Sequence, residues 1–106
     1  MVKIPLKNTP SQKLRVVLAE QNCTISIYWR FGNTYMDLMV NDGIVEQGAI
    51  CRNRQSIVKI AQHIFSGTLC FLDLLGDNDP DYTLFNERYI LLYVPANEAL
   101  PGGLSV

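Results

Sequence analysis

The most regular feature of the chain is an alternation of apolar and polar residues. Residues 22–30 place Cys23, Ile25, Ile27 and Trp29 on one face of an extended segment, and Thr24, Ser26, Tyr28 and Arg30 on the other. Residues 34–40 repeat the pattern, with Met36, Leu38 and Val40 opposite Tyr35, Asp37 and Met39. A period of two is typical of a strand with one buried face. Both segments are therefore predicted to be half-buried strands.

Turn-forming residues separate these two strands from each other and from a third. Gly32-Asn33 follows the first strand, and both residues tolerate the positive φ that a tight hairpin turn requires. Asn41-Asp42-Gly43 is a second signal of this kind, and it precedes a predicted strand over residues 44–51. Gly48 inside that strand indicates a bulge or a close backbone approach. The three strands are expected to form a meander.

The flanking segments predict further strands. Residues 14–19 form an apolar, β-branched run, with its turn expected at Gln21-Asn22. Residues 2–6 fit a short edge strand, because Pro5 cannot donate a backbone hydrogen bond. Residues 68–75 are densely apolar and predict a strand that is covered on both faces. Residues 87–94 predict the last strand, which Pro95 ends.

Residues 53–66 fit two structures. Ile57, Ile60, Ala61 and Ile64 have helical spacing, and Ser56 could cap a short helix. Part of the same segment also fits an irregular strand. We expect a loop with one helical turn or none.

Seven or so short strands with frequent turns predict an all-β fold. The expected architecture is a small antiparallel sandwich or a partly closed barrel with at most one short helix. Its length of 106 residues indicates one domain, over residues 1–95. Residues 96–106 contain Pro101-Gly102-Gly103 and are expected to be a flexible tail.

Composition and charge exclude several classes of partner. Nine basic and ten acidic residues give a formal net charge of -1 without a basic block, which argues against nucleic-acid binding. The apolar runs are far shorter than the ~20 residues that span a membrane. No apolar signal segment follows Met1, so synthesis and retention in the cytoplasm are expected. Charged residues make up only 18% of the chain, which suggests that a partner covers part of its surface.

The sequence holds little that indicates catalysis. His63 is the one histidine, whereas an activated nucleophile or a zinc site needs further groups nearby. Cys23, Cys51 and Cys70 are widely spaced and are predicted to be reduced core residues. No dinucleotide, phosphate-loop, hydrolase or zinc-protease motif occurs. We therefore expect no enzyme activity and no cofactor.

Two carboxylates interrupt apolar strands. Asp37 and Asp73 are each expected to pair with Arg15 or Arg88, because a buried carboxylate needs a partner to be tolerated.

The segment Asp77-Asn78-Asp79-Pro80-Asp81 resembles the start of a calcium loop. A complete EF-hand loop needs Gly at its sixth position and Glu at its twelfth, where this chain has Tyr82 and Arg88. A turn in which Asp or Asn side chains bond the backbone and Pro80 fixes φ is the favoured interpretation. Whether Asp77, Asp79 and Asp81 bind an ion stays open at this point.

Four aromatic residues surround the first hairpin turn. They are Tyr28, Trp29, Phe31 and Tyr35. In an OB-like barrel such a cluster could stack nucleotide bases or hold a ligand. Because basic residues do not accompany it, the cluster is interpreted as part core and part protein interface.

A series of short motifs resembles the phage baseplate plug family of contractile-tailed bacteriophages. In chain order they are Ile4-Pro5-Leu6, Pro10-Ser11-Gln12, Val17-Leu18, Gln21-Asn22-Cys23, Tyr35-Met36-Asp37-Leu38, Val40-Asn41, Gly48 with Cys51, Phe65-Ser66-Gly67-Thr68-Leu69, Phe71-Leu72-Asp73, Gly76, Asp79-Pro80-Asp81-Tyr82, Arg88 and Leu91-Leu92-Tyr93. The resemblance covers residues 4–94. The family pattern has glycines around Leu84 and Asn86, which this chain lacks.

The resemblance implies a structural virion protein of the tail baseplate, with no reaction. Such a protein would be a plug-like part at the central hub and tail-tube tip, made in the host cytoplasm and assembled with hub and tail-tube proteins. A homo-oligomer of three or six copies would suit the tail axis. Another baseplate or tube-initiator role, or a small OB-like domain that binds nucleic acid or a ligand, is the alternative.

Contacts with these partners are expected at eight residues: Ile4, Tyr28, Trp29, Tyr35, Asp79, Pro80, Tyr82 and Arg88. Residues 2–6 are expected to be an exposed strand edge that extends a neighbour's sheet. On this hypothesis, Ile4→Asp would block assembly and leave the isolated domain folded.

Overall fold

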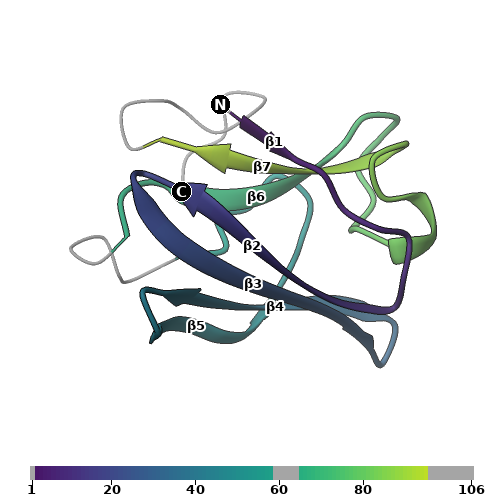
Figure 1. The fold of residues 1–106 in the computed structure, drawn as a ribbon. Helices are drawn as coiled ribbons and strands as arrows, with labels where there is room; N and C mark the ends of the chain where they lie inside the picture. The colour runs from purple at the N-terminus through teal and green to yellow at the C-terminus, as the bar shows by residue number, and fades with distance from the viewer. Residues whose placement is uncertain (1, 59–64, 96–106) are drawn as a thin grey trace.

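Two antiparallel sheets pack face to face in the computed structural model, which describes residues 2–58 and 65–95 (Figure 1). The strands are β1 (Val2–Ile4), β2 (Ser11–Leu18), β3 (Gln21–Arg30), β4 (Asn33–Val40), β5 (Gly43–Ile50), β6 (Thr68–Asp73) and β7 (Tyr89–Val94). One 3₁₀ turn, η1 (Tyr82–Leu84), precedes β7. The all-β prediction is confirmed, in its sandwich form. The tail expected at residues 96–106 lies outside the described residues.

One sheet is a meander in the order β2-β3-β4-β5. Its registers place Cys23 opposite Val40 and Ile25 opposite Leu38, so the apolar set of each strand lies on the same side. Leu14 and Val16 of β2 pack against this core from the outermost strand. The alternation in the sequence therefore predicted correctly which face of the meander is buried.

The turn predicted at Asn41-Asp42-Gly43 is confirmed, and the other two tight turns of this sheet lie at slightly different positions from those expected. The pairs with positive φ are Ala19-Glu20, Phe31-Gly32 and Asn41-Asp42. Two successive residues with positive φ match the right-handed twist of the flanking strands. The turns predicted at Gln21-Asn22 and Gly32-Asn33 are therefore wrong by two residues and one residue, because strand pairing continues through Gln21 and Asn33.

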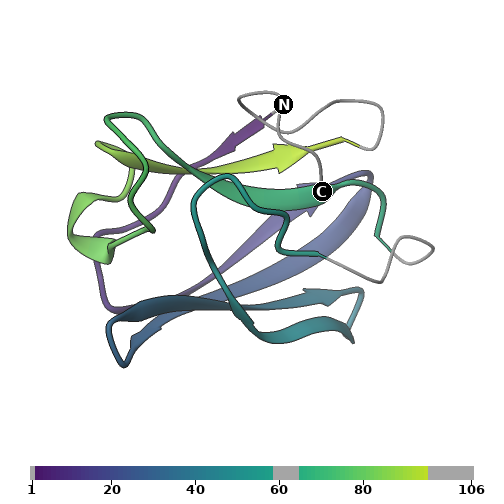
Figure 2. The ribbon, with the colours of Figure 1, turned by 180° about the vertical axis from the view of Figure 1, so that it is seen from behind.

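The second sheet has the order β1-β7-β6 and covers the inner face of the meander (Figure 2). Phe71 of β6 is fully buried and stacks on Phe85, with ring centroids 5.6 Å apart. The opposite face of β6 is also buried, because Cys70 packs with Leu92 and Val94 in a separate cluster. The prediction of a strand covered on both faces is thus confirmed for Thr68–Asp73, but it is wrong for Leu74 and Leu75, which follow the strand and are exposed.

β1 is an edge strand, as Pro5 indicated, but Ile4 does not lie on an exposed surface. Its side chain is 2% exposed and belongs to the main core. This burial contradicts the expectation that the Ile4 side chain contacts a partner, and we now expect Ile4→Asp to unfold the domain. The physical reason is that β1 is paired to β7 with Ile4 opposite Leu91, which directs its side chain between the sheets.

The chain after β5 runs beside β6 and covers its free edge. The amides of Arg54 and Ile57 donate to the carbonyls of Phe71 and Leu69, at 2.8 and 2.9 Å. Ser56 is buried, and its hydroxyl lies 2.7 Å from Thr68 Oγ1. No helix occurs at residues 53–58 or 65–66, and the rest of the expected helical turn, with His63, lies outside the described residues.

A hydrogen bond from Thr34 fixes the end of the sandwich nearest the β3–β4 turn. Its buried hydroxyl donates to the carbonyl of Pro80 at 2.8 Å. Thr34→Val keeps the shape and leaves that carbonyl without its donor, so we expect unfolding free energy to fall by about 1–3 kcal/mol. Urea denaturation measures the loss. Thr24→Val, on the half-exposed outer side of β3, is the matched control and should change stability by about 0.5 kcal/mol or less.

Candidate assembly surface

One side of the four-stranded sheet faces away from the second sheet. We call it the outer face. The strand registers arrange its central side chains in three rows across the sheet: Ser11-Tyr28-Tyr35-Ile50, Lys13-Ser26-Asp37 and Arg15-Thr24-Met39-Ile44. The pairs Arg30-Asn33 and Val17-Asn22 lie at its two ends. Within the described residues, no other strand packs against this face (Figures 1 and 2). Most of these side chains are half-buried by their neighbours on the sheet.

An aromatic group lies at the end of the outer face near the β3–β4 turn. The rings of Tyr28 and Tyr35 stack with centroids 5.9 Å apart, and the Arg30 guanidinium lies 5.2 Å from the Tyr28 centroid. Large aromatic side chains and arginine are the residue types that most often anchor protein interfaces. Because they already contact one another, these residues would lose little side-chain freedom on docking.

A bulge in β5 positions the polar partner of this aromatic group. The pairing of β4 with β5 shifts between Met36 and Met39, and Gly48 has a φ of +64°. The Gly48 amide and the Tyr28 hydroxyl both donate to Asp37 Oδ1, at 2.7 and 3.0 Å. Burial, and then the hydrogen bond to Asp37, raise the pKa of Tyr28. The bulge predicted from Gly48 is confirmed, and Asp37 bonds Tyr28 and the backbone rather than the expected arginine.

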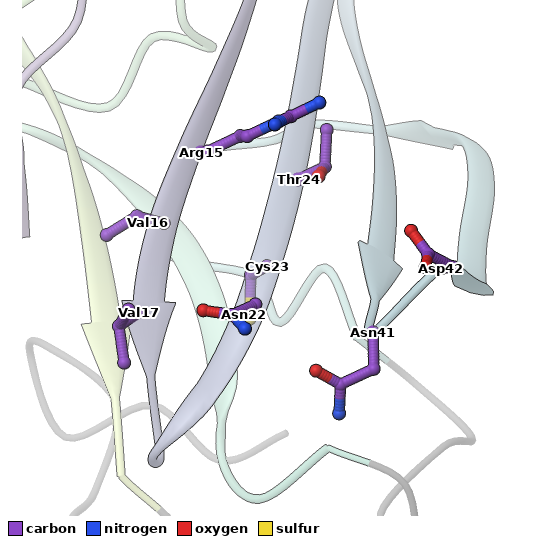
Figure 3. A pocket seen from close by; sticks show the side chains of 8 residues that line it. All are labelled: Arg15, Val16, Val17, Asn22, Cys23, Thr24, Asn41 and Asp42. Atoms are coloured by element: carbon purple, nitrogen blue, oxygen red, sulfur yellow. The ribbon is translucent and has the colours of Figure 1, made fainter.

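A pocket of about 570 Å³ lies at the opposite end of the outer face (Figure 3). We call it the outer-face pocket. Its lining residues come from β2, β3 and the β4–β5 turn, and they are Arg15, Val16, Val17, Asn22, Cys23, Thr24, Asn41 and Asp42. Figure 3 shows the Arg15 side chain extending from β2 across the β3 ribbon toward Thr24. The pocket therefore combines a cation, an anion and exposed apolar atoms.

The remaining aromatic residues that were expected at an interface lie at the end of the sandwich. Trp29 meets Tyr82 of η1 edge to face, with centroids 5.7 Å apart. Pro80 is buried under the Thr34 hydrogen bond. Trp29 and Tyr82 keep part of their surface exposed, so they can extend the outer face around this end.

The acidic turn bonds its own backbone, as the sequence predicted. Asp81 caps η1, and its Oδ1 accepts from the amide and hydroxyl of Thr83, both at 2.9 Å. Asp79 accepts from the Asn53 amide at 3.0 Å and from Arg52 at 3.3 Å. Among residues 2–58 and 65–95, no group of three His, Cys, Asp or Glu side chains could hold a metal ion.

Asp73 and Arg88 form a bidentate ion pair. Arg88 donates from Nε to Asp73 Oδ1 at 2.8 Å and from Nη2 to Oδ2 at 2.9 Å. The amides of Leu75 and Asn78 also donate to this carboxylate, whose side chain is completely covered. The hydrogen bonds from Arg88 hold the pKa of Asp73 well below its usual range. The pairing predicted for Asp73 is confirmed, and Arg88 is occupied in holding the turn before η1.

The pairing of Asp73 with Arg88 should make the stability of the fold depend on pH. Because folding lowers the pKa of Asp73, its contribution is present above the unfolded-state pKa of about 4 and is lost as pH falls through the folded-state pKa. Asp73→Asn should therefore be much less stable than the natural chain at pH 7, and the difference should shrink steadily below about pH 4. Urea denaturation at several pH values measures it. Asp77→Asn, an exposed carboxylate in the same turn, should show a far smaller difference throughout.

The three cysteines are buried and free, as expected. Burial raises the pKa of Cys70 to about 11 and raises those of Cys23 and Cys51 as well. A thiol with a raised pKa holds little thiolate and is a poor nucleophile or metal ligand. The described residues also contain no helix long and apolar enough to cross a membrane.

The structure thus distributes the eight expected contact residues over four places. Tyr28 and Tyr35 lie on the outer face, and Trp29, Pro80 and Tyr82 lie at the end of the sandwich. Asp79 and Arg88 hold turns, and Ile4 is in the core. Sequence reasoning missed Met39, Ile44 and Ile50, which extend the apolar part of the outer face. All three lie on the same side of the sheet as Tyr35, and the alternating pattern could have identified them from the sequence.

One family model matches the chain over residues 1–97, and its description reads "Cyanophage baseplate Pam3 plug gp18". The match therefore includes every described strand. Among curated proteins, none matches the chain.

Proposed function

The chain belongs to the cyanophage baseplate plug family, which gives it a structural role in a phage tail baseplate, and from this premise we propose that it docks through its outer face. The proposed position is that of a plug at the central hub and tail-tube tip. Its action is protein–protein assembly, without catalysis. Hub and tail-tube proteins are the proposed partners, in an assembly made in the host cytoplasm that holds three or six copies of the chain.

The observation that carries the proposal is the composition of the outer face. Tyr28, Tyr35, Met39, Ile44 and Ile50 give it an aromatic and aliphatic centre, and arginine side chains lie at both ends. An apolar centre with charges at the margin is the usual anatomy of a protein interface. A sheet side that faces water permanently would instead carry mostly charged and small polar residues.

Three carboxylates take part in contacts within the fold, which supports a role in assembly rather than in catalysis. Asp37 accepts from Tyr28 and Gly48, Asp73 pairs with Arg88, and Asp79 holds the segment after β5. Each of these carboxylates is bonded within the fold, in a contact that holds a turn or a bulge. These contacts therefore stabilise the local shape of the surface.

Ile44 gives the sharpest test of the docking face. It is 63% exposed on β5, directly opposite Met39 on the outer face. A glutamate there would remain in water in the free protein but would be buried against the partner in the assembled tail. We expect Ile44→Glu to fold normally and to reduce incorporation at least tenfold. Quantitative mass spectrometry of purified particles measures the copy number relative to hub and tube proteins.

The matched control is Leu75→Glu. Leu75 is 76% exposed and follows β6, outside the outer face. It should be incorporated at the natural copy number. Normal incorporation of Ile44→Glu would refute the outer face as the docking surface, and equal loss in both variants would show that the contacts are not confined to that face.

A further inference from the structure

Phe31, at the tip of the β3–β4 hairpin, is unusual in its exposure and in its backbone conformation. It is 94% exposed, the most exposed of the large apolar side chains in residues 2–58 and 65–95, and its φ is +51°. Glycine or asparagine adopts this conformation at lower cost and would leave no apolar ring in water. Strand pairing accounts for the φ, as it does at Ala19 and Glu20, so the aromatic ring held in water is the feature that points to a partner.

The tip and the outer-face pocket lie at opposite ends of the same strand. Cys23 lines the pocket near the start of β3, and Phe31 follows its last residue. Eight residues of strand place the two roughly 26 Å apart. Phe31 therefore cannot enter the pocket of its own chain, whereas the Phe31 of another copy can reach it.

The tip and the pocket have complementary chemistry. Phe31 is preceded by the exposed cation Arg30, and the pocket has the exposed anion Asp42 at its margin. The pocket also offers Arg15, whose guanidinium can lie against an aromatic ring, and the exposed apolar side chain of Val17. Within the described part of the chain, neither Arg15 nor Asp42 takes part in an ion pair.

We propose that Phe31 of one copy inserts into the outer-face pocket of the next copy, in a head-to-tail contact. Each copy then uses its tip on one neighbour and its pocket on the other. A contact of this type closes into a ring when the rotation between copies permits. The aromatic group at Tyr28 and Tyr35 lies between the two contacts and stays available to a different protein. This contact rests on the proposed assembly of three or six copies and assigns the Arg15 and Thr24 end of the outer face to the contact between copies.

Sedimentation velocity of the purified full chain over a rising concentration range tests this contact. The natural chain should form oligomers, and Phe31→Ala should stay monomeric at concentrations at least tenfold higher. Val17→Glu, which places a second carboxylate in the lining of the pocket, should also stay monomeric. Leu75→Ala is the control for loss of an exposed apolar side chain elsewhere, and it should oligomerise like the natural chain.

Mixing the two deficient variants tests the head-to-tail arrangement. Phe31→Ala keeps a working pocket and Val17→Glu keeps a working tip, so an equal mixture has one usable contact. We expect dimers with one copy of each variant, and nothing larger. A natural chain that stays monomeric, a Phe31→Ala variant that assembles normally, or a mixture that regains the full oligomer would each overturn the proposal.

Disulfide cross-linking tests the same contact independently of oligomer size. The three natural cysteines are buried, so an introduced exposed thiol reports its own contacts. Under mild oxidation, Gly32→Cys, which keeps Phe31 and has open space around an added Cβ, should give a disulfide-linked dimer when mixed with Asn41→Cys. A mixture of Leu75→Cys with Asn41→Cys should give none. Equal yields from the two mixtures would contradict a specific contact between tip and pocket.

Discussion

Ile4→Asp is expected to unfold the domain rather than to block its assembly alone. Ile4 is 2% exposed and lies between the sheets, opposite Leu91 of β7. An aspartate there would place a carboxylate in the apolar core without a partner. The loss of several kcal/mol is comparable to the ~5–15 kcal/mol total stability of a domain this size.

Circular dichroism during heating, together with the yield of soluble protein, measures this loss. Val2→Asp is the matched control, because Val2 lies two residues earlier in the same strand and is 51% exposed. It should melt within a few degrees of the natural chain. A folded Ile4→Asp variant with a normal melting temperature would contradict the position of β1 in the sandwich.

Gly67→Ala is expected to have the second largest effect on stability. Gly67 has a φ of +89°, and an added Cβ would lie 2.4 Å from the carbonyl oxygen of Val94 and 3.0 Å from the Tyr93 hydroxyl. The close atom belongs to the backbone of β7, so it cannot move without disturbing the β6–β7 pairing. Steric overlap and the unfavourable φ together should cost about 3 kcal/mol or more.

Gly32→Ala separates the two contributions to that cost. Gly32 has a φ of +75°, but nothing lies within 4 Å of an added Cβ. Only the conformational cost remains, which is about 1–2 kcal/mol. Urea denaturation of both variants should show a clearly larger loss for Gly67→Ala. Equal losses would mean that the backbone near Val94 can move aside at little cost.

The sheet faces were the most predictable part of the fold, because they depend on a period that the residues themselves display. Ile25, Ile27 and Leu38 alternate with polar neighbours, and all three lie in the core. The same rule applied to residues 2–6 would have put Ile4 and Leu6 on one buried face, where both are found. The proline beside them correctly indicated an edge strand but says nothing about the side-chain direction.

The turn positions were less predictable, because strand pairing overrides the preference of individual residues. Ala19, Glu20 and Phe31 take positive φ although none of them favours it. The gain from pairing two full strands outweighs that cost. Asn86 shows the opposite case: it has a φ of +67° at a place where the family pattern has glycine nearby, and asparagine tolerates that conformation well.

The candidate surface was predictable only in part, since it depends on contacts between distant segments. The aromatic residues near the β3–β4 turn were identified from sequence, and Asp73 was correctly expected to pair with an arginine. The bond from Thr34 to Pro80, across 46 residues, has no local signature. The outer-face pocket combines residues from three segments and appears only once the sheet is formed.

Hydroxyl-radical footprinting of purified particles, compared with the free protein, tests the central claim most directly. We expect Tyr28, Tyr35 and Met39 to become protected in the particle, while Leu74 and Leu75 keep the labelling of the free protein. Equal labelling of the three outer-face residues in particle and free protein would contradict docking through that face.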